Sequence, residues 1–349
     1  MKKAIIVSLL ASVLAAGAFA QVSFSGEAYV GIRLTNPPNA DESITTDHRE
    51  YGAPRFDFTV TAGQENYGAR LITRATPGSF IVRGIYGWVD FGGFTDAGDS
   101  LRLSMGQFAD GVGVIQLDSD LPELFIPHTT GFRLAYGTPL PGLTVQAAFR
   151  TDGHDMQAFA EQMIIGATYV APFFVANFYY DLAANVRTLF AINFPSIPGV
   201  PDLSAGFKLF ALNLATWDTH VPGLGGQFTA YQRIGYRISW PVSVSLIASQ
   251  TVFASNNPVS DYTELMFGPG ITYRNRSLPN LTASFRAMLD SPDHFDTMNL
   301  VLRPAIEKSL RGPALFYAQY DLRLPDVGSS SPFDRAVHTI GFGLEIRAF

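Results

Sequence analysis

From residue 21 onward, the chain is a succession of segments, each of roughly ten residues, in which apolar and polar side chains alternate. Each segment ends at a cluster of Pro, Gly, Asn or Asp. In the segment 21–34, the even positions are apolar or small, like Phe24, and the odd positions include polar groups such as Arg33. Successive side chains of a strand point to opposite faces, so each strand has one apolar and one polar face. Such strands, repeated behind an export signal, predict a transmembrane antiparallel β-barrel with a wet lumen.

The first twenty residues have the organisation of a secretory signal peptide. They begin with two lysines after Met1, continue with an apolar run over 4–16, and end in the small-x-small pattern Ala-Phe-Ala at 18–20. The apolar run is too short for a comfortable membrane-spanning helix. We therefore expect residues 1–20 to be cleaved and residues 21–349 to form a single transmembrane β-barrel.

The composition narrows the class of protein further. A net charge of −6 argues against a nucleic-acid partner. The chain has no Cys, so disulfides cannot hold it together and the sheet must do so. Although 47% of the residues are hydrophobic, the chain after residue 20 has no uninterrupted apolar run of 18 residues, so helical membrane spans are not expected.

The alternation predicts eighteen strands, whose boundaries can shift by several residues. They are 21–34, 54–63, 66–75, 79–91, 99–107, 131–138, 143–151, 161–170, 173–182, 186–194, 203–212, 226–239, 242–254, 263–274, 280–290, 296–307, 313–324 and 336–349. Connections after even-numbered strands are mostly short, and those after odd-numbered strands are mostly longer and polar. This pattern is typical of periplasmic turns and outer loops. One miscounted hairpin would leave sixteen strands, and either number encloses an aqueous lumen.

Aromatic residues dominate the parity that we assign to the lipid face. They are Phe24, Phe56, Phe58, Tyr67, Phe80, Trp88, Phe174, Phe178, Tyr180, Phe207, Phe285 and Phe316. Rings near strand ends form the interfacial girdles of membrane barrels. A soluble β-sandwich or propeller is the rival fold, but it does not explain why the opposite face carries so many arginines.

The opposite parity carries most of the positive charge and is assigned to the lumen, where water solvates it. A lipid-facing Arg near the midplane would cost about 2–4 kcal/mol. Any one arginine could simply pair with a nearby carboxylate. The candidates for a positive wall at the pore constriction, on consecutive strands, are Arg55, Arg70, Arg83, Arg102 and Arg133. The other pore-lining candidates are Arg33, Arg150, Arg187, Arg233, Arg237 and Arg286.

The segment 108–130 carries Asp118, Asp120 and Glu123 among several Leu, Phe and Ile. An outer loop this apolar is expected to fold inward and pack on the barrel wall, leaving its acids toward the opening. A positive wall facing a negative rim would then set selectivity by charge as well as by size. The alternative is an external loop packed on a neighbouring loop or subunit.

Three features resemble the general porins of Gram-negative outer membranes. The stretches RGIYGWVDFGG at 83–93 and LRLSMGQ at 101–107 look like the fourth and fifth strands of that family, which puts 108–130 in the place of its inward-folded third loop. The stretch FRLAYGTP at 132–139, followed by GLTV, looks like the next hairpin. The chain also ends in Phe349, as these porins usually do.

The resemblance implies passive diffusion of ions and small hydrophilic solutes, a homotrimer, no cofactor, and a place in the outer membrane of a Gram-negative-type bacterium. It also implies that the barrel assembly machinery recognises the C-terminal strand ending in Phe349. Two departures remain. The apolar set at 340, 342, 344 and 346 is one register off from Phe349, which a bulge could reconcile. Eighteen strands, instead of sixteen, leave room for a substrate-specific porin.

Other functions fit the sequence less well. A barrel enzyme needs a catalytic constellation, and the chain has neither Gly-x-Ser-x-Gly nor His-Glu-x-x-His. A plugged receptor or fatty-acid-type transporter needs an N-terminal plug, whereas the first strand starts at residue 21. A structural barrel with a filled lumen is a further alternative. Six His lie in or beside predicted loops, several next to acids, and we read them as ordinary loop composition without a metal site.

Overall fold

The structure is a computed structural model. It describes residues 21–38, 41–46, 53–93, 95, 98–108, 129–150, 163–182, 187–212, 227–239, 241–253, 262–275, 277–278, 280–291, 297–310 and 313–347. The predicted signal peptide therefore lies outside the described residues. Over the described ranges, no helix has the length and apolar character needed to cross a membrane.

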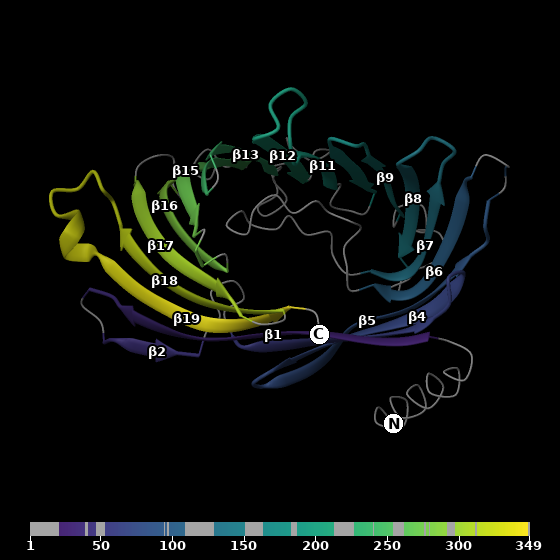
Figure 1. Ribbon diagram of the computed structural model, residues 1–349, viewed down its shortest axis with the longest axis horizontal. Coiled ribbons are helices and arrows are strands. Elements are labelled where there is room, and N and C mark those ends of the chain that lie inside the picture. Colours follow the sequence, from purple (N-terminus) through teal and green to yellow (C-terminus); the bar gives the residue numbers. More distant parts are fainter. Residues whose placement is uncertain are drawn as a thin grey trace.

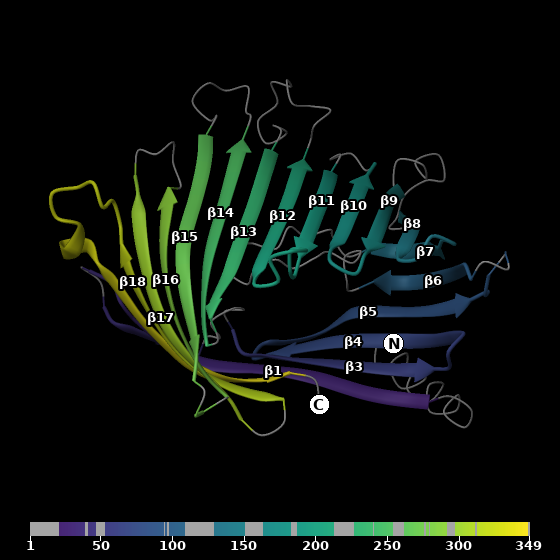
Figure 2. The same ribbon diagram turned by 45° about the horizontal axis from the view of Figure 1, so that its top comes forward.

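Almost all of the described chain belongs to one antiparallel sheet (Figures 1 and 2). Its strands are β1 (Gln21–Asn36), β2 (Ser43–Thr45), β3 (Arg55–Gly63), β4 (Tyr67–Thr76), β5 (Ser79–Asp90), β6 (Ser100–Phe108), β7 (Thr129–Gly137), β8 (Leu143–Arg150), β9 (Met163–Val170), β10 (Val175–Asp181), β11 (Arg187–Phe194), β12 (Leu203–Leu212), β13 (Gln227–Ser239), β14 (Val242–Phe253), β15 (Tyr262–Arg274), β16 (Leu281–Ser291), β17 (Asn299–Ser309), β18 (Ala314–Leu324) and β19 (Val337–Arg347). A short 3-10 helix, η4 (Pro332–Arg335), precedes β19.

The sheet closes on itself. Consecutive strands from β3 to β19 pair antiparallel, and β1 joins the two ends: Tyr29 lies opposite Arg55 of β3 and opposite Glu345 of β19. The three-residue β2 pairs only with the end of β1 and adds no wall strand. The wall of the described barrel thus has eighteen strands, which confirms the predicted count and excludes sixteen.

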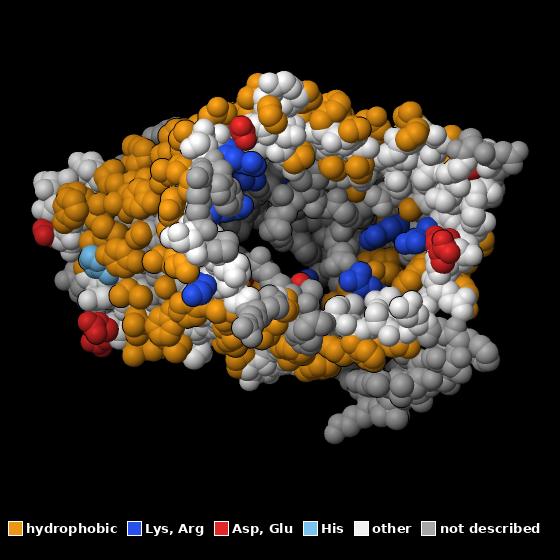
Figure 3. All heavy atoms as spheres, in the orientation of Figure 1, with side chains coloured by type: hydrophobic (Ala, Val, Ile, Leu, Met, Phe, Trp, Pro, Cys, Tyr) orange, Lys and Arg blue, Asp and Glu red, His pale blue; other side chains and the backbone are white. Residues whose placement is uncertain are grey.

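The two faces of the sheet have the polarity predicted from the sequence. Apolar side chains at the outward parity are exposed, with Phe24 at 61%, Phe80 at 66% and Met105 at 59%. Side chains at the opposite parity are far less exposed, with Tyr29 at 4% and Glu345 at 0%. Figure 3 shows the apolar side chains over the outer surface and cationic side chains around a central hollow. A water-soluble fold would not expose large apolar residues so consistently, whereas a lipid environment favours it.

A β-bulge in β5 makes one side-chain assignment wrong. Ile72 of β4 lies opposite Gly84, but the next residue, Thr73, lies opposite Val82, so Arg83 is an extra residue in β5. A bulge residue reverses the alternation beyond it. Trp88, predicted to face lipid, therefore faces the lumen.

Contacts around Trp88 agree with this orientation. Its ring lies 6.0 Å from the guanidinium carbon of Arg102, and Trp88 pairs with Ser104 across the ladder. On the other side is Gly68, where a Cβ atom would overlap the indole ring. The glycine thus leaves room for a large lumen side chain.

The C-terminal strand follows the predicted parity. Ile340 and Phe342 are exposed on the outer surface, at 48% and 38%, while Glu345 faces inward. The bulge expected near Phe349 falls outside the described residues.

Candidate functional site: the charged lumen wall

The strands β3–β7 bring the predicted arginines together on one side of the lumen. These five strands carry six arginines and only two acidic residues. The arginines are Arg55, Arg70, Arg74, Arg83, Arg102 and Arg133. All five residues of the predicted positive wall are therefore present in one patch, and Arg74 joins them. We call this patch the arginine wall.

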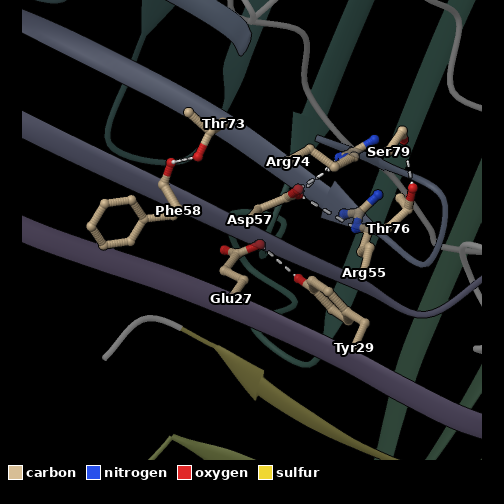
Figure 4. Close-up of polar contacts among 9 residues, drawn as sticks. All are labelled: Glu27, Tyr29, Arg55, Asp57, Phe58, Thr73, Arg74, Thr76 and Ser79. Carbon is tan, nitrogen blue, oxygen red and sulfur yellow. Dashed lines mark hydrogen bonds and ion pairs between the residues drawn. The ribbon is translucent and has the colours of Figure 1, made fainter. Parts of the chain in front are cut away.

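An ion cluster forms one end of the arginine wall (Figure 4). Asp57 of β3 accepts hydrogen bonds from Nε and Nη2 of Arg74, at 2.7 and 2.8 Å, and lies 3.4 Å from Nε of Arg55. The Arg55 guanidinium sits 4.8 Å from the centroid of the Tyr29 ring, and the Tyr29 hydroxyl donates to Glu27 at 2.7 Å. Asp57 thus contacts two arginines at once, and Glu27 lies opposite it in the ladder, so acids and arginines alternate at this point.

A second ion pair lies at the far end of β5. Asp90 accepts two hydrogen bonds from Arg102, through Nε and Nη2, both at 2.7 Å. This bidentate geometry largely neutralises Arg102. Arg102 therefore contributes less positive charge to the predicted wall than its sequence position alone would indicate, because Asp90 is bound to it.

Aromatic contacts hold two further members of the wall. The Arg133 guanidinium lies 4.5 Å from the centroid of Phe108, a side chain only 2% exposed. The Phe108 ring in turn lies 5.1 Å from that of Tyr86, whose hydroxyl accepts a hydrogen bond from Arg70 at 3.5 Å. Cation–π contacts orient a guanidinium without cancelling its charge. These contacts fix the positions of the two guanidinium groups on the lumen face.

The opposite side of the lumen also carries cationic side chains, together with acids such as Asp321 and Glu345. Arg286 of β16 and Arg303 of β17 lie directly opposite each other in the ladder. Arg303 is held by Asp321 at 2.7 and 3.3 Å. Arg233 of β13 and the buried Lys208 of β12 share this inward face. Lys208 lies opposite the buried Tyr231, and Arg233 is two residues from Tyr231 on the same face of β13. Blue side chains are accordingly seen on both sides of the hollow in Figure 3.

The remaining predicted residues fall into three groups. Arg33 lies near the outer end of β1, and Arg237 lies near the inner end of β13, 60% exposed and 3.7 Å from Asp202. The backbones of Arg150 and Arg187 lie in β8 and β11, but their side chains are outside what the structure describes. The predicted acidic rim also lies outside the described residues: Asp118, Asp120 and Glu123.

Sequence reasoning missed the acids that pair with the wall. Asp57 and Asp90 lie opposite Arg74 and Arg102 on the neighbouring strands. On the other side of the lumen, Asp321 forms an ion pair with Arg303. Asp57 is two residues from Arg55 in the same strand, so its parity alone could have identified it as a lumen residue. The partner of each acid depends on strand register, which the alternation does not provide. Among the described residues, no group of three or more His, Cys, Asp or Glu could hold a metal ion.

The lumen face of β8–β12 has a different character from the arginine wall. It carries a buried cluster of Ala148, Ile164, Tyr179, Leu189 and Phe210, none more than 8% exposed. Their inward orientation follows from the register, since Ala148 lies opposite the inward Arg133. The Tyr179 hydroxyl is held within this cluster by hydrogen bonds with Gln146 and Thr168.

Comparison with known proteins finds similar solved structures. No protein-family model and no curated protein matches the chain. Among solved structures, it is similar to an anion-selective porin from Comamonas acidovorans, with 10% identity, a TM-score of 0.57, and coverage of 95% of this chain and 100% of that chain. It is also similar to OprD of Pseudomonas aeruginosa, with 13% identity, a TM-score of 0.55, and 94% and 96% coverage. A third similar structure is OpdQ of the same organism, with 10% identity, a TM-score of 0.59, and coverage of 94% of this chain and 99% of that chain.

The chain has the fold of the outer-membrane porins. At these identities, the likeness establishes fold and leaves solute preference and assembly to the chain's own residues. One of these neighbours is described as an anion-selective porin, and OprD is described as an outer membrane protein. These descriptions support the prediction of a non-enzyme only indirectly.

Proposed function

We propose that the protein is an outer-membrane porin of a Gram-negative-type bacterium, through which ions and small hydrophilic solutes diffuse passively. The observation that carries this proposal is a closed eighteen-stranded barrel whose outer face exposes apolar residues and whose lumen face carries the charges. Lipid is the solvent suited to the outer face, and water is the solvent suited to the inner one. No energy source or cofactor is needed for such diffusion.

The segment 108–130 is proposed as the inward-folded loop of the constriction. Two observations on described residues support it. The first residue of this segment, Phe108, which also ends β6, faces the lumen and is buried against the arginine wall. The lumen face of β8–β12 offers an apolar surface, and this segment is rich in Leu, Phe and Ile. Asp118, Asp120 and Glu123 would then face the arginine wall across the opening.

The charge of the arginine wall favours anions in this part of the lumen. Six arginines and two aspartates on β3–β7 leave a clear positive excess, and charged rings of one sign enrich counter-ions in a pore. Replacing the three loop acids together with Asn or Gln should make the channel more anion-selective, measured as reversal potential under a salt gradient. Unchanged selectivity would remove the segment 108–130 from the constriction.

A substrate-specific porin is the second candidate. Several wall arginines are fixed against rings or acids, as Arg55 is against Tyr29, so an anion would meet them at defined positions. Swelling of liposomes containing the purified protein separates the two candidates. In a general porin, swelling rates for neutral sugars and organic anions follow molecular size. In a substrate-specific porin, one chemical class enters much faster than others of equal size. No swelling with any solute would contradict both.

We also propose a homotrimer and recognition of the C-terminal strand by the barrel assembly machinery, both from the resemblance to general porins. The outward apolar set around Ile340 and Phe342 supports the second proposal, because it presents a continuous apolar face on the last strand. Substituting Phe349 by Ser should lower the yield of folded barrel in the outer membrane. An unchanged yield would show that a different signal is used.

A further inference from the structure

Two carboxamides lie on the outer face of the barrel, where every neighbour is apolar. Gln232 of β13 and Gln250 of β14 have the outward parity and are exposed. In the ladder, Gln232 lies opposite Ala248 and Gln250 lies opposite Ala230, so the two amides are diagonal neighbours. We call these four residues the carboxamide patch. Its strands stand side by side in Figure 2.

The carboxamide patch lies within the apolar band. On β13, Gln232 is followed by Ile234, Tyr236 and Ile238 on the same face, exposed at 51%, 43% and 57%. Tyr236 is near the inner end of β13, where an aromatic girdle is expected. Four residues separate Gln232 from Tyr236, which is about 10 Å of height for a tilted strand. The apolar band is about 25 Å tall, so Gln232 is near its middle and Gln250 is somewhat further out.

Lipid does not satisfy these amides. Each carboxamide has two N–H donors and an oxygen that accepts. Over the described part of the chain, neither side chain has a hydrogen bond to the protein. A bond between the two amides would still leave donors and acceptors of both facing hydrocarbon. Polar groups in the bilayer are costly when unpaired, and they act as contact points between membrane segments, above all beside small residues.

We propose that the carboxamide patch is a contact between copies of this chain, placed at the symmetry axis of the oligomer. A carboxamide both donates and accepts, so an identical patch satisfies it. All copies enter the membrane with one orientation, so the symmetry axis is parallel to the membrane normal and each amide meets its counterpart at the same depth. Ala230 and Ala248 allow the two surfaces to approach closely. The inference rests on the proposed location in the outer membrane.

The absence of native Cys allows a direct test. A Gln232→Cys variant, oxidised in native outer membranes, should form a covalent pair of chains at least tenfold faster than a Leu71→Cys control. Leu71 is a lipid-facing residue of β4, nine wall strands away around the ring. Equal rates, or no pairing with either a disulfide or a short bis-maleimide linker, would overturn the proposal.

A second variant keeps the test independent of thiol geometry. Replacing both glutamines with Leu suits a lipid-facing surface, so the barrel should still fold and conduct. Analytical ultracentrifugation in mild detergent should show an oligomer for the native chain and monomers for the double variant. An unchanged oligomer, or a native chain that is already monomeric, would contradict the proposal. Because conductance is measured separately, failure of this contact is distinguishable from failure of the porin assignment.

Discussion

A matched pair of arginine substitutions on β3 tests the assignment of the two barrel faces. Val60 lies opposite Phe24 and Leu71 and points outward, while its neighbour Thr59 lies opposite Ser25 and Ile72 and points inward. Both are near the middle of β3. Val60→Arg would place a guanidinium in hydrocarbon, whereas Thr59→Arg would place it in the lumen, two residues from Asp57 on the same face.

The expected difference follows from the cost of charge in the bilayer. An arginine on the lipid face near the midplane destabilises a barrel by about 2–4 kcal/mol, which is about 30-fold to nearly 1,000-fold in the folding equilibrium. The lumen variant should change stability by less than about 1 kcal/mol, because water and a nearby carboxylate solvate the new charge. The comparison cancels the shared effects of a longer side chain and of the denatured state.

Equilibrium unfolding in phospholipid vesicles measures both values. Guanidinium titrations followed by Trp fluorescence give the unfolding free energy when folding is reversible, with equal slopes confirming that the same surface is exposed. Stabilities that fall equally in the two variants would refute the assignment of faces. A larger loss for Thr59→Arg would invert it.

Two further substitutions test the lumen wall. Asp57→Asn should shift the reversal potential toward anions, because it removes the carboxylate shared by two arginines; Asp202→Asn, at the exposed inner rim, should shift it less. Equal shifts would mean that the ion cluster is remote from the conduction path. Gly68→Ala adds a Cβ that overlaps the Trp88 ring, and should destabilise the barrel by roughly 1–3 kcal/mol, measured by the same titrations. Unchanged stability together with unchanged conductance would show that Trp88 is not packed against Gly68.

The wall of the barrel could be predicted from the sequence because a strand has a period of two. With lipid outside and water inside, each wall strand must keep one parity apolar, so the alternation marks the strands and their faces together. The short β2 was not predicted, since three residues carry no periodic signal. It adds nothing to the wall.

The error at Trp88 shows where this reasoning stops. An unbroken strand over 79–91 would alternate throughout, but a bulge at Arg83 reverses the alternation. A clue was available: Arg83 and Asp90 have opposite parity, so an unbroken strand would place one of these charges in lipid. Charged residues of opposite parity in one predicted strand therefore indicate a bulge.

The composition of the site was predicted only in part. The arginine wall follows from parity alone, because all its members point inward on neighbouring strands. The partners of Arg74, Arg102 and Arg303 depend on register, which turn lengths and packing decide and alternation does not. The acids of the segment 108–130 stay a prediction, as does their place opposite the arginine wall.

Single-channel recording in a planar bilayer under a salt gradient tests the central claim most directly. The purified, folded protein should give stable, large, ohmic steps, with a reversal potential of the sign expected for anion preference. Closures in threes would agree with a trimer. A folded, β-rich, heat-modifiable protein that produces no conductance would mean that the lumen is filled, and would contradict the porin assignment.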